Sequence, residues 1–182
     1  MLKKKAALEL CSFVTLLLLL VACSEPDRPD RVRKGEPPEG VKSFEVGKGG
    51  VHKEGDLQYA HSPPVGGPHN IAWQNCGFYT KPVREENAVH SIEHGAVWIA
   101  HSPDLPKEQV EELRDVADSQ VYILVSPYPD LGSPVVATAW GKQLRLQNAS
   151  DPKLGRFIRA YIQSPKAPEP GAACTGGVGQ PQ

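Results

Sequence analysis

The chain has 182 residues, of which 40% are hydrophobic, and a formal net charge of −1 at pH 7. This length suits one domain of ordinary size with tails. Beyond the first few residues the chain has no basic cluster, so nucleic acid is excluded as the partner and attraction to anionic lipids is excluded as a membrane anchor.

The N-terminus is typical of a bacterial lipoprotein export signal. Three lysines, Lys3–Lys5, precede the apolar stretch Phe13–Val21. That stretch is too short to span a bilayer comfortably, since a spanning helix needs about 20 apolar residues. It ends in Leu20-Val21-Ala22-Cys23, which resembles the lipobox, where the cysteine thiol accepts a lipid and becomes the mature N-terminus. We therefore predict a signal peptide over residues 1–22 and a protein held in the cell envelope by lipidated Cys23, on the extracytoplasmic side of a bacterial membrane. The alternative is an ordinary signal peptide in which Cys23 has no role.

The rest of the chain divides by composition into three parts. Residues 23–45 are rich in proline, glycine and charge and cannot bury a core, so they are predicted to form a flexible linker. Residues 46–164 form the predicted α+β domain. Residues 165–182 form a Pro/Gly-rich tail, which has little apolar content and is predicted to be pinned by Cys174.

The predicted domain begins with loops and continues with regular elements. Proline and glycine punctuate residues 51–83, which indicates a long ordered loop region. A short helix is predicted from Asn87 to the residue before Gly95, because asparagine is a good N-cap and glycine a good C′ residue. The later patterns predict helices that open at Pro106 and Asp151, and strands at 96–100, 121–125, 135–140 and 143–146. The fold class is therefore a small α+β domain with a sheet of three or four strands and two main helices.

Two of the four cysteines fall in the export signal, Cys11 within it and Cys23 at its end. Cys76 and Cys174 remain, and an even pair in an oxidising compartment is most simply a disulfide. Such a bridge closes a loop of roughly 100 residues and is worth about 4–5 kcal/mol of stability. The alternative is that one or both thiolates bind a soft metal ion.

The positions of the histidines are the clearest non-random feature of the sequence, because all six lie within residues 52–101. His90 and His94 are four residues apart in the predicted short helix, so their imidazoles stack on one face, where they can share a metal ion. His69 follows a rigid Gly-Gly-Pro turn that can hold its ring at a fixed point, and His52 lies on a similar loop. The sequence therefore predicts a copper or zinc site with four candidate ligands, His52, His69, His90 and His94.

The segment His90-Ser91-Ile92-Glu93-His94 also matches the H-x-x-E-H pattern of zinc peptidases, in which both histidines bind metal and the glutamate activates water. Those enzymes need a long helix and a distant acidic ligand, whereas Gly95 ends this helix. Glu93 is thus a weak candidate for a catalytic base, and it fits better as a carboxylate that orients an imidazole. Trp73 and Tyr79 are expected to pack in the core, with a wall of the site as the alternative.

Several segments, taken in order, resemble the domain-of-unknown-function family 3105, whose members are typically exported or membrane-anchored bacterial proteins. The segments are Pro63–His69, Asn75–Tyr79, Val89–Ile99, Ala137–Gly141 and Pro168–Gly171 with Cys174. Histidines of the family pattern coincide with His52, His69, His90 and His94, and its cysteine coincides with Cys76. His61 and His101 stand where relatives commonly have tyrosine, so they are weaker candidates. The resemblance implies an exported domain and brings no established reaction.

Three classes of function remain open from the sequence. The first is an extracytoplasmic lipoprotein that handles copper or zinc. Because Met1 is the only methionine, an imidazole site is favoured over a methionine-rich Cu(I) carrier. The second is a non-catalytic binding or scaffold module with structural histidines and another envelope protein as partner. The third is an enzyme, either a metal-dependent hydrolase with the H-x-x-E-H site or a copper oxidase. Convergence of His69, His90 and His94 within about 5 Å would favour the first and third classes over the second.

Overall fold

The computed structural model of the chain describes residues 35–182. The predicted signal peptide, Cys23 and residues 24–34 lie outside the described residues. The strands are β1 (Lys42–Ser43), β2 (Gly77–Phe78), β3 (Val97–His101), β4 (Ile123–Pro127), β5 (Val135–Ala139) and β6 (Lys142–Leu146), and the helices are α1 (Glu85–Glu93), α2 (Lys107–Ser119) and α3 (Pro152–Tyr161). Among the described residues, no helix has both the length and the apolar character needed to cross a membrane.

The six strands form one mixed sheet in the order β1-β6-β5-β3-β4-β2. Its centre is β3, which pairs in parallel with β4 and antiparallel with β5. All five residues of β3 are buried, as its continuous apolar run indicates. Helix α2 connects the parallel strands β3 and β4, so these elements form a βαβ unit. Strands β5 and β6 form a hairpin whose tight turn includes Gly141 at φ 66°.

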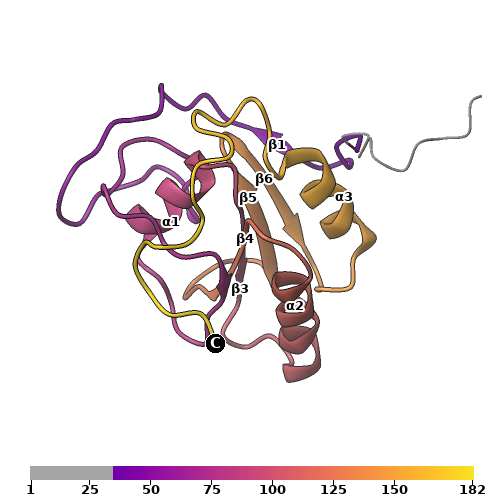
Figure 1. The fold of residues 1–182 in the computed structure, drawn as a ribbon. Coiled ribbons are helices and arrows are strands. Elements are labelled where there is room, and N and C mark those ends of the chain that lie inside the picture. The colour runs from indigo at the N-terminus through magenta and orange to yellow at the C-terminus, as the bar shows by residue number, and fades with distance from the viewer. Residues whose placement is uncertain (1–34) are drawn as a thin grey trace, which may run out of the picture. The chain divides into compact units, whose positions relative to one another are not determined.

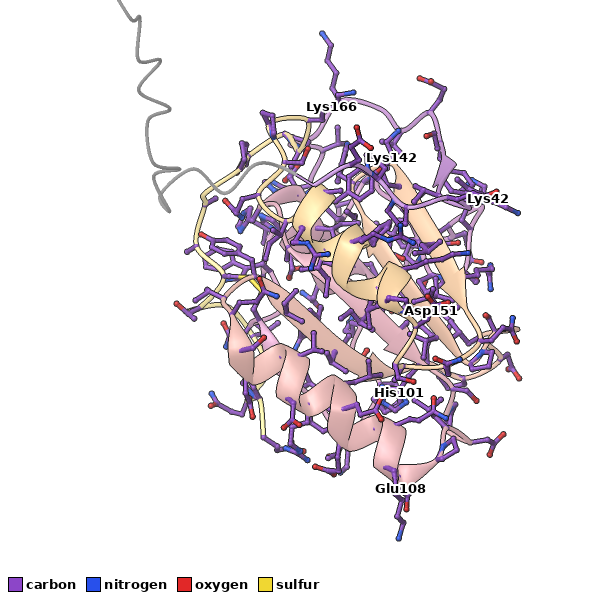
Figure 2. The ribbon with its side chains drawn as sticks, turned by 90° about the vertical axis from the view of Figure 1, so that its right-hand side faces the viewer. Lys42, His101, Glu108, Lys142, Asp151 and Lys166 are labelled. Carbon is purple, nitrogen blue, oxygen red and sulfur yellow. A yellow bond between two sulfur atoms is a disulfide. The ribbon has the colours of Figure 1, made fainter. Side chains whose placement is uncertain are left out.

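Helices α2 and α3 cover one face of the sheet (Figure 1), and the larger apolar core lies between them and the strands. From α2 this core takes Leu113 and Ala117, and from α3 it takes Phe157. Asp151 caps α3 by accepting a hydrogen bond from the Lys153 amide at 2.8 Å, and proline follows it at the first helical position. Figure 2 looks onto this face and labels Asp151 where α3 begins and His101 where β3 ends.

Helix α1 and long loops cover the opposite face (Figure 1). A second, smaller core lies there, in which Ala88 and Ile92 of α1 contact a group of side chains that includes Trp98 of β3. Side chains alternate along a strand, so neighbouring residues of β3 serve the two different cores. The residues that the sequence singles out for metal binding belong mostly to this second face.

The structure confirms the predicted α+β class and corrects its details. The sheet has six strands rather than three or four, because β1 and β2 are two-residue strands with too few residues to show a periodic pattern. Strand β1 lies inside the segment predicted to be linker and pairs with β6, so the ordered domain begins before residue 46. Helix α1 begins at Glu85 rather than Asn87, and its first turn holds two glutamates, which suit the positive end of a helix.

Candidate metal centre

A group of polar side chains is buried beside α1, which supplies two of them. His90 and Glu93 are three residues apart, so they project from the same side of the helix. His90 is 4% exposed and Glu93 is fully buried. Because α1 ends at Glu93, the next residue, His94, occupies the cap position and no longer continues the helix.

Two loop histidines are brought to α1 by a short backbone pairing. His52 and His69 form an isolated parallel β-bridge. The His69 amide donates to the Val51 carbonyl at 3.0 Å, and the Lys53 amide donates to the His69 carbonyl at 2.8 Å. His69 is fully buried, whereas His52 is exposed. The predicted loop region therefore contains a defined support for the site.

The side chains of these four residues converge. The ring centroids lie 4.7 Å apart for His69 and His90, 5.0 Å for His52 and His69, and 5.1 Å for His52 and His90. One donor atom from each histidine and one carboxylate oxygen of Glu93 all lie within 4.8 Å of one another. A group with this composition and spacing can hold a metal ion.

Hydrogen bonds to the backbone set the tautomers of the buried imidazoles. Nδ1 of His69 lies 2.8 Å from the Gly67 carbonyl oxygen, and Nδ1 of His90 lies 2.8 Å from the Asn70 carbonyl oxygen. A carbonyl only accepts, so each Nδ1 carries the hydrogen and, in the neutral ring, each Nε2 presents a lone pair. This is the arrangement that orients metal-ligating histidines in proteins.

One of the two oxygens of the Glu93 carboxyl group has no hydrogen bond. Oε1 accepts a hydrogen bond from the Gly50 amide at 2.6 Å. Oε2 lies 2.9 Å from Nε2 of His69 and 4.0 Å from Nε2 of His90, yet Oε2 and the His69 Nε2 are buried without a hydrogen bond. Two lone pairs that face each other across a buried gap repel unless a cation or proton lies between them.

His90 is a poor source of that proton. Burial lowers its pKa to about 4, against the opposing effect of its hydrogen bond to the Asn70 carbonyl, and the imidazoles of His94, His69 and His52 lower it further. The imidazole of His90 is therefore neutral near pH 7. Imidazole nitrogens beside a buried carboxyl oxygen are donors that Zn²⁺ and Cu²⁺ bind in proteins.

The chain approaches Glu93 so closely at Gly49 that a side chain does not fit there. A Cβ at this position would lie 2.1 Å from Oε1 of Glu93 and 2.4 Å from the Pro168 side chain. Gly47, two residues earlier, has nothing within 4 Å of its corresponding position. Glycine at position 49 therefore lets the backbone amide of Gly50 reach the carboxylate.

Two tryptophans border the cluster. The Trp140 ring lies edge-on to His69, with ring centroids 6.3 Å apart. The Trp73 ring lies 5.7 Å from that of His90 and 5.2 Å from that of His94. Tyr79 instead belongs to the smaller apolar core, where its hydroxyl donates to the Asn75 carbonyl. Trp73 thus walls the site, and Tyr79 packs in the core as expected.

His94, although predicted as a ligand, does not join the four converging donors. Its Nδ1 lies 2.6 Å from the Ala173 carbonyl oxygen, and its Nε2 lies 3.7 Å from a carboxylate oxygen of Glu169. Its ring does contact that of His90, with centroids 4.4 Å apart. The C-terminal segment therefore turns the His94 donor atom toward Glu169, and Glu93 takes the fourth place in the cluster.

The two weaker candidates also lie outside the cluster. His61 packs against the Phe44 ring with centroids 4.4 Å apart. His101 follows Val97 and Ile99 at alternate positions of β3, so it projects toward the α2–α3 core rather than toward α1. Its Nδ1 contacts the Ser102 carbonyl oxygen, and its buried Nε2 has no hydrogen bond.

Cys76 and Cys174 form a disulfide, with Cα atoms 5.4 Å apart and a sequence separation of 98 residues. The Cys76 amide also donates to the Cys174 carbonyl at 2.8 Å. The bridge places the C-terminal segment beside Trp73, whose carbonyl accepts from the Val178 amide. A thiolate of this pair is not available as a metal ligand while the disulfide is intact.

Sequence reasoning missed Glu93 as a member of the donor set and missed Gly49 altogether. The available signal for Glu93 was its position three residues after His90. On a helix this spacing places two side chains on one face, just as the spacing of four between His90 and His94 does. For Gly49 the only signal was the Gly49-Gly50 pair, which also suits an ordinary turn. Its contact with Glu93 joins segments far apart in the chain.

The fold and site together define a small α+β domain with a buried histidine–carboxylate cluster. Residues 51–176 match the family described as "Protein of unknown function (DUF3105)", and the chain belongs to this family. The matched region contains all four members of the cluster and both cysteines of the disulfide. No curated protein and no solved structure gives a significant match to the chain.

Proposed function

We propose that the protein is an extracytoplasmic lipoprotein that binds copper or zinc through His52, His69, His90 and Glu93, and that it serves in metal handling. The observation that carries the proposal is the convergence of the four donor atoms within 4.8 Å of one another. A metal ion with bonds of about 2.0–2.1 Å separates two tetrahedral ligands by about 3.3 Å. The two donor pairs that involve Glu93 Oε2, at 2.9 Å and 4.0 Å, bracket that separation.

Charge supports the proposal as strongly as distance does. A divalent ion at this position neutralises the buried carboxylate of Glu93 and accepts the lone pairs that the His69 and His90 tautomers direct inward. Three imidazoles and a carboxylate suit Zn²⁺ and Cu²⁺, and the general affinity order favours Cu²⁺. Three of the four predicted ligands, His52, His69 and His90, are thereby retained, and Glu93 replaces His94.

The proposed location rests on the N-terminal sequence. Residues 1–22 are proposed to direct export, and Cys23 to anchor the protein by its lipid on the extracytoplasmic side of the membrane. The Cys76–Cys174 disulfide supports this location, because disulfides persist in oxidising compartments outside the cytosol. A protein in this position can exchange metal with another envelope protein.

The second candidate is a non-catalytic envelope module in which a proton takes the place of the metal. The 2.9 Å approach of His69 to Glu93 favours it, since a protonated imidazole forms a buried ion pair at that distance. Four histidines also donate a hydrogen bond from Nδ1 to a backbone carbonyl, and such bonds hold loops in place without any metal. A hydrolase of the H-x-x-E-H type is less well supported, because Glu93 stands among the donors and His94 faces Glu169.

Metal content tests the proposal directly. The full chain, extracted in mild detergent without a polyhistidine tag, is analysed for bound elements and titrated with Cu²⁺ and Zn²⁺ beside the variants His90→Ala and His61→Ala. We expect near-stoichiometric metal in the wild type and in His61→Ala, and its loss in His90→Ala. Free metal at a hundredfold excess over Kd should stabilise the wild type by about 2.7 kcal/mol. Metal-free protein whose thermal unfolding is unchanged by either ion would overturn the proposal and leave the protonated cluster.

A further inference from the structure

We infer that His52 is the exchangeable ligand of this site and that the metal leaves when an external imidazole-type nitrogen donor takes its place. The inference rests on the proposed metal binding and adds the route by which the cargo is transferred. It follows from an asymmetry among the four donors, three of which are held rigidly while one is not.

Three donors are buried and tied to the backbone. His69 and Glu93 are fully buried, and His90 is 4% exposed. His69 and His90 each donate one hydrogen bond of 2.8 Å from Nδ1 to a main-chain carbonyl, and Glu93 accepts one of 2.6 Å from a main-chain amide. These bonds fix the direction of the remaining atom of each side chain that can bind metal. Side chains locked in this way keep their geometry when a ligand is exchanged.

His52 differs from the other three in each of these respects. It is exposed, and within residues 35–182 its ring has no hydrogen bond. Only its backbone is fixed, by the bridge to His69. Rotation about its side-chain bonds therefore moves the imidazole away from the cluster without breaking any hydrogen bond of the described structure.

The surroundings give external donors access at the same point. Residues 51–56 are all exposed, and their segment belongs to the long loops on the α1 side of the molecule (Figure 1). Glu93, His69 and His90 are each less than 5% exposed, so solvent meets the cluster at His52. An approaching donor meets the metal on this side and finds the other three ligands already in place.

The exchange is balanced in charge and electrons. The bond from the metal to the His52 nitrogen breaks as a bond to the external nitrogen forms, and both are neutral two-electron donors. This first exchange needs no added proton or electron. Release of the metal then requires the bonds to His69, His90 and Glu93 to break in turn as bonds to further donors of the acceptor form, and a proton from solvent takes the place of the metal at the Glu93 carboxyl group. The preferred acceptor is thus a molecule that presents an accessible imidazole.

Cobalt spectroscopy and metal transfer test the inference. The full chain, loaded with Co²⁺, is compared with His52→Ala and with His90→Ala, and imidazole is the external donor. We expect His52→Ala to retain bound metal and to bind imidazole, with the visible cobalt bands returning to the wild-type pattern. Transfer of Zn²⁺ to a chromogenic chelator should be about tenfold or more faster from His52→Ala, since variants of one site differ mainly in dissociation rate. Rescue by imidazole should not occur in His90→Ala, whose position is buried.

Two outcomes overturn the inference while leaving metal binding itself intact. One is a His52→Ala protein that loses metal as fully as His90→Ala, which would make the four donors equivalent. The other is a wild-type transfer rate that does not depend on the chelator concentration, which would show that the metal leaves before any new donor arrives. Failure of the wild-type chain to bind metal at all overturns the proposed function instead. His61→Ala serves as the control for loss of a histidine outside the cluster.

Discussion

Helices α1 and α2 lie on opposite faces of one sheet and are buried in different ways. In α2 only Leu113 and Ala117 are buried, so the helix is an ordinary amphipathic element with a wet outer face. In α1 eight of the nine residues are buried, and several of them are polar, including His90, Ser91 and Glu93. A polar helix that is enclosed on all sides has to satisfy its side chains internally. The comparison separates a face with ordinary amphipathic packing from a face that encloses the candidate metal centre.

The largest expected effect tests the α2 side. Leu113 is fully buried in the larger core, and Leu113→Ala removes contacts and leaves a cavity. We expect a loss of about 3 kcal/mol in the free energy of unfolding, measured by denaturant titration. Metal bound per folded molecule should be unchanged, because the helix lies across the sheet from the cluster. A variant whose free energy of unfolding is almost unchanged but which binds less metal would contradict this division between the two faces.

Gly49→Ala tests the close approach on the α1 side. The added Cβ would lie 2.1 Å from Oε1 of Glu93, so the loop has to move away and the Gly50 amide loses its hydrogen bond to the carboxylate. We expect a destabilisation of about 1–3 kcal/mol together with weaker metal binding. Gly47→Ala is the matched control, because its Cβ meets nothing within 4 Å. Equal behaviour of the two variants would remove the structural role assigned to Gly49.

The smallest expected effect concerns His101 and pH. Burial lowers the pKa of His101, against the effect of its hydrogen bond to the Ser102 carbonyl, so the folded protein binds fewer protons here than the unfolded chain does. Stability attributable to His101 is therefore present above the unfolded pKa of about 6.5 and declines as the pH falls below it. In His101→Asn, whose amide can still donate to Ser102, the free energy of unfolding should depend less on pH below about 6.5. An unchanged pH dependence would show that His101 titrates alike in both states.

Regular elements could be predicted from the sequence, because their patterns are local. Pro106 with Val110 and Leu113 predicts α2, and the apolar run before His101 predicts β3, since each pattern spans a single element. Strands β1 and β2 could not be predicted, because two residues show no periodicity and their pairing depends on distant partners. The number of strands was therefore underestimated, although the fold class was correct.

The site was predicted in part for the same reason. His90 was found from its helical spacing, and His69 from the rigid turn before it. Whether Glu93 or His94 joins His90 in the cluster depends on two features. One is the end of α1 at Glu93, and the other is the contact of His94 with the carbonyl of Ala173, which lies far along the chain. Helical spacing alone permits both residues, so only long-range contacts could decide between them. The assignment of Cys23 and of the cellular location stays a prediction.

The enclosure of α1 also has a consequence for truncation of the chain. All four cluster residues lie at or before position 93, whereas the carbonyl that contacts His94 Nδ1 belongs to Ala173 and the disulfide partner of Cys76 is at position 174. A chain cut before Ala173 would keep the four converging residues and lose both the contact that holds the His94 ring and the bridge that holds the C-terminal segment. The C-terminal tail, which has little apolar content, is therefore part of the structure that separates His94 from the candidate metal centre.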